Sequence, residues 1–157
     1  MNVTPRILVQ ASDFDIGAET ERLARAADDV GAVATFAGYC RSERGTLAGL
    51  EIEHYPGMAE AEIARVAAEA QQRWPIDALT IIHRFGMIEA GGRIVFVGAA
   101  SRHRQGAFAA CEMLMDYMKS EAPFWKRATL ADGARADWVE AAAGDDEALK
   151  RWRTDQK

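Results

Sequence analysis

Cysteine and histidine are scarce in this sequence. Of its 157 residues, only two are cysteine, Cys40 and Cys111, and three are histidine, at positions 54, 83 and 103. Two cysteines do not make a disulfide framework, so we expect both to be free thiols in a reducing compartment. The histidines show no paired spacing and no Cys-x-x-Cys motif accompanies them, so the sequence predicts no metal site.

Long apolar runs, phosphate-binding glycine motifs and an excess of basic residues are also lacking. No stretch approaches the roughly 20 apolar residues of a membrane span, and the first residues lack the basic-then-apolar pattern of a signal peptide. We therefore expect a cytoplasmic protein that does not bind membranes. No glycine pattern fits a P-loop or a dinucleotide fingerprint. The net charge of −5 and the pI near 5.2 argue against broad binding to nucleic acid.

The remaining composition is that of one soluble domain, residues 1–157, with 49% hydrophobic and 27% charged residues. Hydrophobic periodicity predicts antiparallel strands and hairpins with three main helices, an α+β fold. Strands are expected at 6–10, 32–40, 50–55, 78–85, 93–100, 128–130 and 137–139, and helices at 17–29, 58–74 and 105–120. Strand 32–40 is apolar enough to be buried on nearly both faces, and the tail from 141 reads as a marginal helix at best.

The segment 101–126 carries most of the functional information. Ser101 can cap a helix and Pro123 prevents it from continuing. Apolar side chains recur between them at three- and four-residue spacing, which predicts one buried stripe. The stripe comprises Phe108, Cys111, Leu114, Met115 and Met118.

Basic side chains crowd the start of this helix. Arg102, His103 and Arg104 lie where the helix dipole disfavours cations by a few tenths of a kcal/mol each. An anion bound by the free backbone N–H groups would explain His103 and Arg104. The alternative is that the three side chains extend into solvent or pair with surface acids, which is our interpretation for Arg102.

Two lysines lie at and beyond the end of the helix. Lys119 is in the last turn, where a cation is favourable without any function, and Lys126 follows Phe124 and Trp125. A lysine held among aromatic side chains loses hydration, which lowers its pKa and makes it a usable nucleophile or acid/base. The composition leaves this reading and that of a solvated lysine about even. Arg41, after strand 32–40, could face a cleft or simply begin a surface loop.

A distance argument links the two ends of the helix. At a rise of about 1.5 Å per residue, Arg104 and Lys119 would be roughly 22 Å apart on one straight helix. Either the two ends do separate work, or a second subunit brings its basic end to the lysines of the first. We favour the second option, a symmetric dimer with a shared site.

Several strings in fixed order resemble the catalytic (large) subunit of molybdopterin synthase. The resemblance spans about 31–140, with 141–157 as a tail. The strings are Phe36-Ala-Gly38 with Arg41, Glu53-His-Tyr-Pro-Gly-Met58, His83-Arg-Phe-Gly86, Ile94-Val-Phe-Val-Gly98, His103-Arg104, Met115-Asp-Tyr-Met-Lys119 and Ala122-Pro-Phe-Trp-Lys126.

The resemblance implies an α/β-hammerhead fold and a role in molybdenum cofactor biosynthesis. It implies a homodimer at the centre of a heterotetramer, with a small ubiquitin-like sulfur-carrier partner at each end. The partner's C-terminal Gly-Gly thiocarboxylate would supply two sulfurs to cyclic pyranopterin monophosphate, giving the dithiolene of molybdopterin. The resemblance implies neither a metal nor another cofactor for this step.

The resemblance also assigns site residues. Lys119 would lie beside the thiocarboxylate, and Lys126 would act as acid/base or stabilise the intermediate. The substrate would be held by Arg41, with His103 and Arg104 from the neighbouring subunit, and by the flanking Tyr39, Cys40, Arg127 and Ala128, while Phe36 and Met115 would line the pocket. The loop Ser42-Glu-Arg-Gly45 is shorter than the family's usual asparagine-containing loop, and Arg44 could substitute in it.

Two rival functions use the same residues differently. A cysteine-based sulfurtransferase would form a persulfide on Cys40, activated by the cations of the following loop. A non-enzymatic anion-binding adaptor would keep the basic helix end but would not need Lys119 or Lys126.

Overall fold

A computed structural model describes residues 3–139 and 143–154 as two four-stranded sheets with four helices. The first sheet has the order β1 (Arg6–Gln10), β4 (Ala78–Arg84), β6 (Arg93–Ser101), β2 (Ala32–Tyr39). The second has the order β5 (Gly86–Glu89), β3 (Leu47–His54), β7 (Phe124–Leu130), β8 (Arg135–Val139). All pairs are antiparallel except β1 with β4. The α+β class is confirmed.

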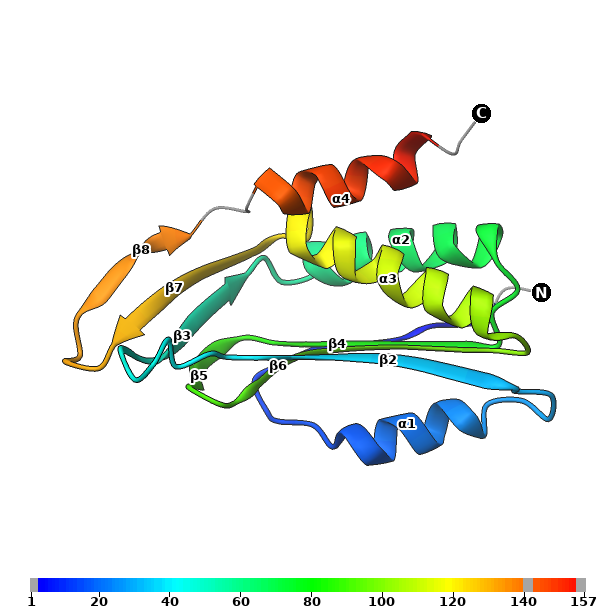
Figure 1. The fold of residues 1–157 in the computed structure, drawn as a ribbon, viewed down its shortest axis with the longest axis horizontal. Helices are drawn as coiled ribbons and strands as arrows, with labels where there is room; N and C mark the ends of the chain where they lie inside the picture. The colour runs from blue at the N-terminus through cyan, green and yellow to red at the C-terminus, as the bar shows by residue number, and fades with distance from the viewer. Residues whose placement is uncertain (1–2, 140–142, 155–157) are drawn as a thin grey trace.

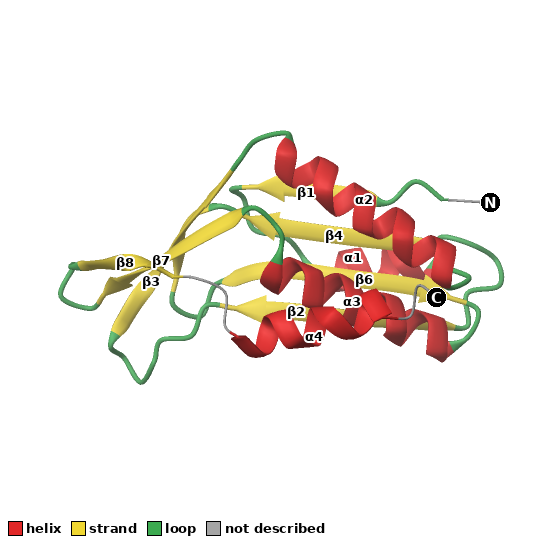
Figure 2. Ribbon diagram, turned by 90° about the horizontal axis from the view of Figure 1, so that it is seen from above, coloured by secondary structure: helices red, strands yellow, loops and turns green. Residues whose placement is uncertain are grey.

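The helices lie on both faces of the first sheet. They are α1 (Ile16–Ala24), α2 (Met58–Arg73), α3 (Arg104–Ser120) and α4 (Ala143–Thr154). Figure 1 shows α1 beneath this sheet, α2 and α3 above it, and α4 on the outer side of α3. The strands β3, β7 and β8 extend beyond the end of the helical layer, as the view from above in Figure 2 shows.

The core is built around the central strands β4 and β6. Nearly every residue of β6 is buried, because helices cover both faces of the sheet there. One apolar cluster lies between the sheet and the α2–α3 layer, and a smaller one, with Phe14, Leu23 and Phe96, lies on the α1 side. α3 is thereby held against the sheet along its length, and this fixes the position of both of its ends.

The tail expected to form a marginal helix at best does form a helix, α4, which packs against α3. Trp152 donates its indole N–H to Asp116 of α3 at 2.7 Å and lies edge-on to Trp74, the residue that follows α2. Leu149 is buried in the main cluster. Tertiary packing therefore supplies the stability that the helix's own sequence lacks. Residues 141, 142 and 155–157 of the expected tail lie outside the described residues.

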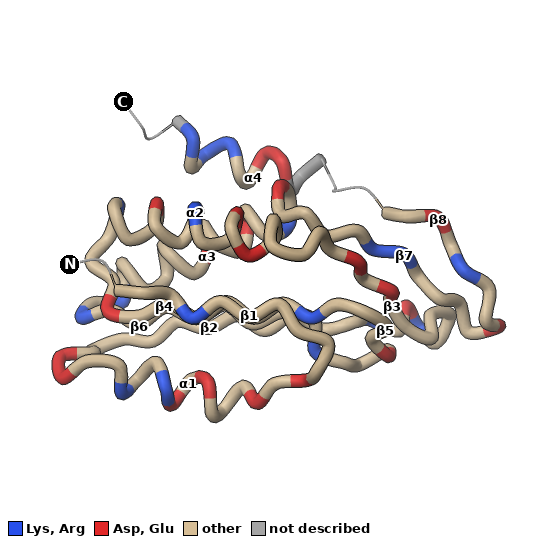
Figure 3. Tube along the Cα trace, turned by 180° about the vertical axis from the view of Figure 1, so that it is seen from behind, with Lys and Arg blue, Asp and Glu red and all other residues tan. Residues whose placement is uncertain are grey.

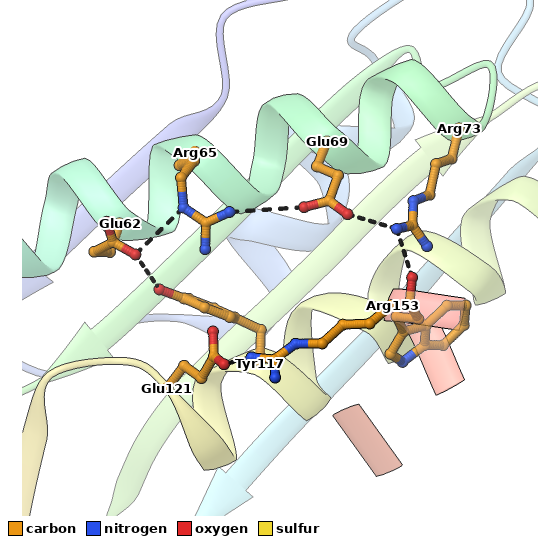
Figure 4. Close-up of polar contacts among 8 residues, drawn as sticks. Glu62, Arg65, Glu69, Arg73, Tyr117, Glu121 and Arg153 are labelled. Atoms are coloured by element: carbon orange, nitrogen blue, oxygen red, sulfur yellow. Dashed lines mark hydrogen bonds and ion pairs between the residues drawn. The ribbon is translucent and has the colours of Figure 1, made fainter. Parts of the chain in front are cut away.

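A series of hydrogen bonds and ion pairs connects the helices α2, α3 and α4, as Figure 4 shows. The hydroxyl of the buried Tyr117 donates to Glu62 at 2.9 Å, and Glu62 also pairs with Arg65 at 3.3 Å. The series continues along α2 through Glu69 to Arg73. The guanidinium of Arg73 donates to the carbonyl of Trp152 of α4 at 2.6 Å. Arg153 of α4 pairs with Glu121, which follows α3. The Arg73–Trp152 hydrogen bond therefore ties α4 to α2, and the Arg153–Glu121 ion pair ties α4 to the end of α3.

Four further expectations need correction. β2 is an edge strand with exposed positions, Phe36 and Tyr39 among them, because only one neighbouring strand covers it. The first helix ends at Ala24, well before residue 29. Ser101 does not cap α3: it is buried at the end of β6, and its hydroxyl donates to the carbonyl of Pro75 at 2.7 Å. Phe108, expected on the buried stripe of α3, is 64% exposed, whereas the other four members of the stripe are buried.

Within the described ranges no helix is long and apolar enough to cross a membrane.

Candidate active site

The two ends of α3 open into two different cavities. The N-terminal cavity, of about 830 Å³, is lined by His103, Arg104 and Phe108 of α3 together with Trp152 of α4. His103 is the N-cap residue, and its side chain makes no capping hydrogen bond. Its neighbour Arg102 also lines this cavity and pairs with Asp29 at 3.6 Å, the surface pairing expected for this residue.

The C-terminal cavity holds both lysines. It has a volume of about 810 Å³, and its lining includes Tyr39, Arg41, Lys119, Lys126 and Ala128. These side chains come from three places: the end of β2 with its loop, the last turn of α3, and β7. Tertiary structure therefore brings together five of the residues named from the sequence. The lining carries three cations, and the two carboxylates of Glu43 and Glu121 leave a net positive charge, which suits anionic reactants.

The end of α3 and the start of β7 are close in the chain, and this explains why Lys119 and Lys126 line the same cavity. α3 ends at Ser120, and the backbone N–H of Glu121 bonds to the carbonyl of Tyr117 at 2.9 Å, as in a closing helical turn. Pro123 then prevents further helix, and the chain enters β7 at Phe124. Lys126 and Ala128 are two residues apart on β7 and thus lie on the same face of that strand.

The loop after Arg41 has an unusual backbone. Glu43, Arg44 and Gly45 have φ values of 47°, 59° and 83°, a left-handed run that only Gly45 adopts without strain. It carries Glu43 back toward Arg41, and their side chains pair at 3.1 Å. Glu43 lines the lysine cavity, whereas Arg44 does not. Sequence reasoning missed Glu43, because nothing in the linear order indicates that the chain turns back here.

Besides His103 and Arg104, which line the other cavity, four residues assigned from the resemblance lie outside the lysine cavity of the single chain: Phe36, Cys40, Met115 and Arg127. Met115 and Cys40 are buried in the core, and Phe36 lies on the edge strand β2. Arg127 is turned away, because its guanidinium bonds to Glu51 of β3 at 2.8 Å. Their assigned roles stay predictions.

The ion pair of Arg127 forms where basic positions of β7 run beside acidic positions of β3 (Figure 3). Glu51 also pairs with Arg135 at 3.6 Å, and the ring of Trp138 lies 4.5 Å from the Arg127 guanidinium. The pKa of Glu51 is lowered, first by its hydrogen bond from Arg127. Arg127 therefore braces β3, β7 and β8 against one another.

Neither cysteine has the setting of a reactive thiol. Cys40 is 2% exposed, and burial raises the pKa of its thiol above the ordinary value. Burial likewise raises the pKa of Cys111 to about 11. Because the thiolate is the nucleophile, both shifts disfavour persulfide chemistry at neutral pH. This geometry weighs against the cysteine-based rival.

No cluster of three or more histidine, cysteine or acidic side chains suited to a metal occurs among the residues that the structure describes.

The aromatic residues noticed beside Lys126 in the sequence, Phe124 and Trp125, both line the lysine cavity. The exposed Val139 also lines it, and the sequence did not single this residue out. Val139 comes from β8, and only the pairing of β8 with β7 at Lys126 brings it to this place.

Comparison with known proteins supports one family assignment. The family model described as MoaE protein matches residues 9–121. A protein of Mesorhizobium japonicum named molybdopterin synthase catalytic subunit is 55% identical over 152 residues, covering 97% of this chain and 96% of the relative. The structure of a molybdopterin biosynthesis MoaE protein from Burkholderia ambifaria is 45% identical, with a TM-score of 0.80 over 95% of this chain and 98% of that one.

A more distant structure, of molybdopterin synthase from Staphylococcus aureus, is 26% identical with a TM-score of 0.74 and covers 88% of this chain and 98% of that one. The resemblance noted from the motif strings is thus confirmed over nearly the whole length. From the fold, the order of the motifs and these similarities together, the chain belongs to the MoaE protein family.

Proposed function

We propose that this chain is an enzyme that transfers sulfur to cyclic pyranopterin monophosphate and so makes the dithiolene of molybdopterin. The observation that carries the proposal is the cavity in which Lys119, Lys126 and Arg41 meet. Three cations from separate parts of the chain converge there, and helix geometry required none of them at that place. Its relatives named molybdopterin synthase catalytic subunit support the reaction class.

The sulfur donor is the C-terminal thiocarboxylate of a small ubiquitin-like partner. Lys119, which is exposed, meets the incoming anionic tail, and the half-buried Lys126 moves protons or stabilises the charged intermediate. Arg41 is largely exposed and can form charge-assisted hydrogen bonds with the substrate phosphate. The word "subunit" in the names of the relatives supports an assembly with a second kind of chain.

The complete site is shared by two copies of this chain. His103 and Arg104 line a cavity at the opposite end of α3 from Lys119, and the two cavities share no lining residue. Fifteen residues of helix separate Arg104 from Lys119, or roughly 22 Å. The exposed aromatic side chains Phe36 on β2 and Phe108 on α3 give a second copy apolar surface to cover.

Reconstitution tests the activity. The purified chain is incubated with thiocarboxylated carrier and cyclic pyranopterin monophosphate, and the dithiolene product is quantified. We expect Lys119→Ala and Lys126→Ala each to lower the rate by about 100-fold or more. Lys150→Ala, at an exposed position of α4, is the matched control. Full activity in a Lys119→Ala, Lys126→Ala double variant would favour the adaptor role and refute the proposal.

Mixed dimers test the shared site. A chain with His103→Ala and a chain with Lys119→Ala are each expected to be inactive as homodimers. Mixing them should restore part of the activity, because one of the two sites in a mixed dimer then has all of its native residues. Stable mixed dimers without any recovery would contradict the shared site while leaving sulfur transfer itself intact.

A further inference from the structure

The two lysines of the cavity belong to different parts of the fold. Lys119 lies at the end of α3, which packs on the first sheet, whereas Lys126 lies on β7 of the second sheet. Only the short segment 121–123 joins α3 to β7. The distance between the two amino groups therefore depends on how the second sheet is set against the first.

An aromatic contact connects the two sheets at Phe124, the residue that follows this segment in the sequence. The imidazole of His83, on β4 of the first sheet, is stacked on the ring of Phe124, the first residue of β7, with centroids 3.7 Å apart and planes inclined by 16°. His54 of β3 lies at 6.2 Å from Phe124 and at 4.4 Å from Phe85. We call these four residues, His54, His83, Phe85 and Phe124, the aromatic joint.

His83 is the fixed member of the joint. It is 2% exposed, and its Nδ1 lies 2.8 Å from the carbonyl oxygen of Arg84. Because a carbonyl can only accept, Nδ1 carries the proton, and the hydrogen bond sets the orientation of the ring. Burial, followed by the positive charge of Lys126 and then that of Lys119, lowers the pKa of His83 to about 3. The ring therefore stays neutral beside the lysines.

We propose that His83 is a positioning residue, which holds Lys126 in place relative to Lys119 through its stacking on Phe124. The role rests on the proposed function, because the lysines are the groups being positioned. Phe124 transmits the effect, since it both lines the lysine cavity and stacks on His83. Lys126 is two residues after Phe124 on β7, so a shift of this ring moves the start of β7 and the lysine with it.

Three variants separate positioning from simple packing. His83→Ala removes the ring beneath Phe124, whereas His83→Phe keeps a flat ring there. Ile82→Ala is the matched control: Ile82 is the adjacent β4 residue, is fully buried, and belongs to the cluster on the α1 side. Ile82→Ala creates a core cavity and should lower the free energy of unfolding about as much as His83→Ala does, but it leaves the four residues of the aromatic joint unchanged. Circular dichroism and thermal unfolding select a temperature at which all variants are folded.

The first readout is the reactivity of the lysines themselves. Trace labelling with acetic anhydride between pH 6 and 11, followed by mass spectrometry, gives the rate for each amino group without carrier or pterin. We expect His83→Ala to change the rate of Lys126 relative to Lys119 by about 3-fold or more, and His83→Phe and Ile82→Ala to leave it near the wild-type value. Equal ratios in all four proteins would overturn the proposal.

The second readout is catalysis. His83→Ala should lower kcat by about 10- to 100-fold, with a much smaller change in KM for the pterin, and His83→Phe should recover most of the loss. Losses of equal size in His83→Ala and Ile82→Ala would assign His83 to packing alone and refute the proposal. If the labelling ratios change as expected but the wild type makes no dithiolene, the proposed function fails and the positioning role stands.

Discussion

Acidification should destabilise this protein through His83, and His83→Phe should remove that sensitivity. In the folded chain the imidazole is buried, faces Lys126, Lys119 and His54, and has a pKa of about 3. In the unfolded chain it would have the ordinary value near 6.5. Between these two values the unfolded chain binds a proton that the folded chain does not, so stability falls as the pH falls. Well above pH 6.5 the imidazole is neutral in both the folded and the unfolded chain, and the full stability is present.

The size of the effect follows from the two pKa values. Each pH unit between them costs about 1.4 kcal/mol, so going from pH 7.5 to pH 5.0 removes about 2 kcal/mol. A domain of this size has a free energy of unfolding of about 5–15 kcal/mol, so the loss is large enough to measure. His83→Phe also loses the hydrogen bond to the Arg84 carbonyl, but that cost is the same at both pH values and cancels in the difference.

Urea unfolding at pH 7.5 and pH 5.0, followed by the fluorescence of the four tryptophans, measures this difference. Wild type and His83→Phe are compared at one chain concentration, because association adds to apparent stability. The wild type should lose about 2 kcal/mol more than the variant between the two pH values. The same pH dependence in both proteins would refute the reasoning and would mean that His83 is charged or solvated in the folded state.

Three further changes have defined outcomes. Tyr117→Phe removes the hydrogen bond to Glu62 and should cost about 1 kcal/mol, a fall in Tm of about 2–4 °C by calorimetry; an unchanged Tm would contradict a role for this bond. Glu43→Gln frees Arg41 and should tighten binding of the phosphorylated pterin by up to about 5-fold in a calorimetric titration, and weaker binding would count against the pairing. Cys40→Ala should keep sulfur transfer within about 2-fold, since a buried thiol is not the nucleophile; loss of activity in the folded variant would restore the persulfide rival.

The candidate site could be predicted in part because helix rules are local. Lys119 stands out as the last cation before Pro123, and His103 and Arg104 stand out where the dipole disfavours them. The expected separation of the two helix ends also holds, since they open into different cavities. Glu43 and Val139 could not be found in this way, because a left-handed loop and a strand pairing bring them to the lysines.

Burial was harder to predict than element type. The apolar run at 32–40 does form a strand, but its place at the sheet edge leaves Phe36 exposed. Composition tells how apolar a strand is and not which neighbours cover it. The same limit explains α4, whose weak intrinsic helix is held by Trp152 and Leu149 against α3.

By itself, the sequence determined where most helices and strands lie and which side chains are chemically out of place, because periodicity, proline and helix ends act over a few residues. Only the tertiary structure decided which of those side chains meet. Lys119 and Lys126 share a cavity, and His83 of a third element stacks on Phe124 beside it, because the aromatic joint connects the two sheets there. Contacts between elements far apart in the chain depend on how those elements pack, and no local pattern encodes that packing.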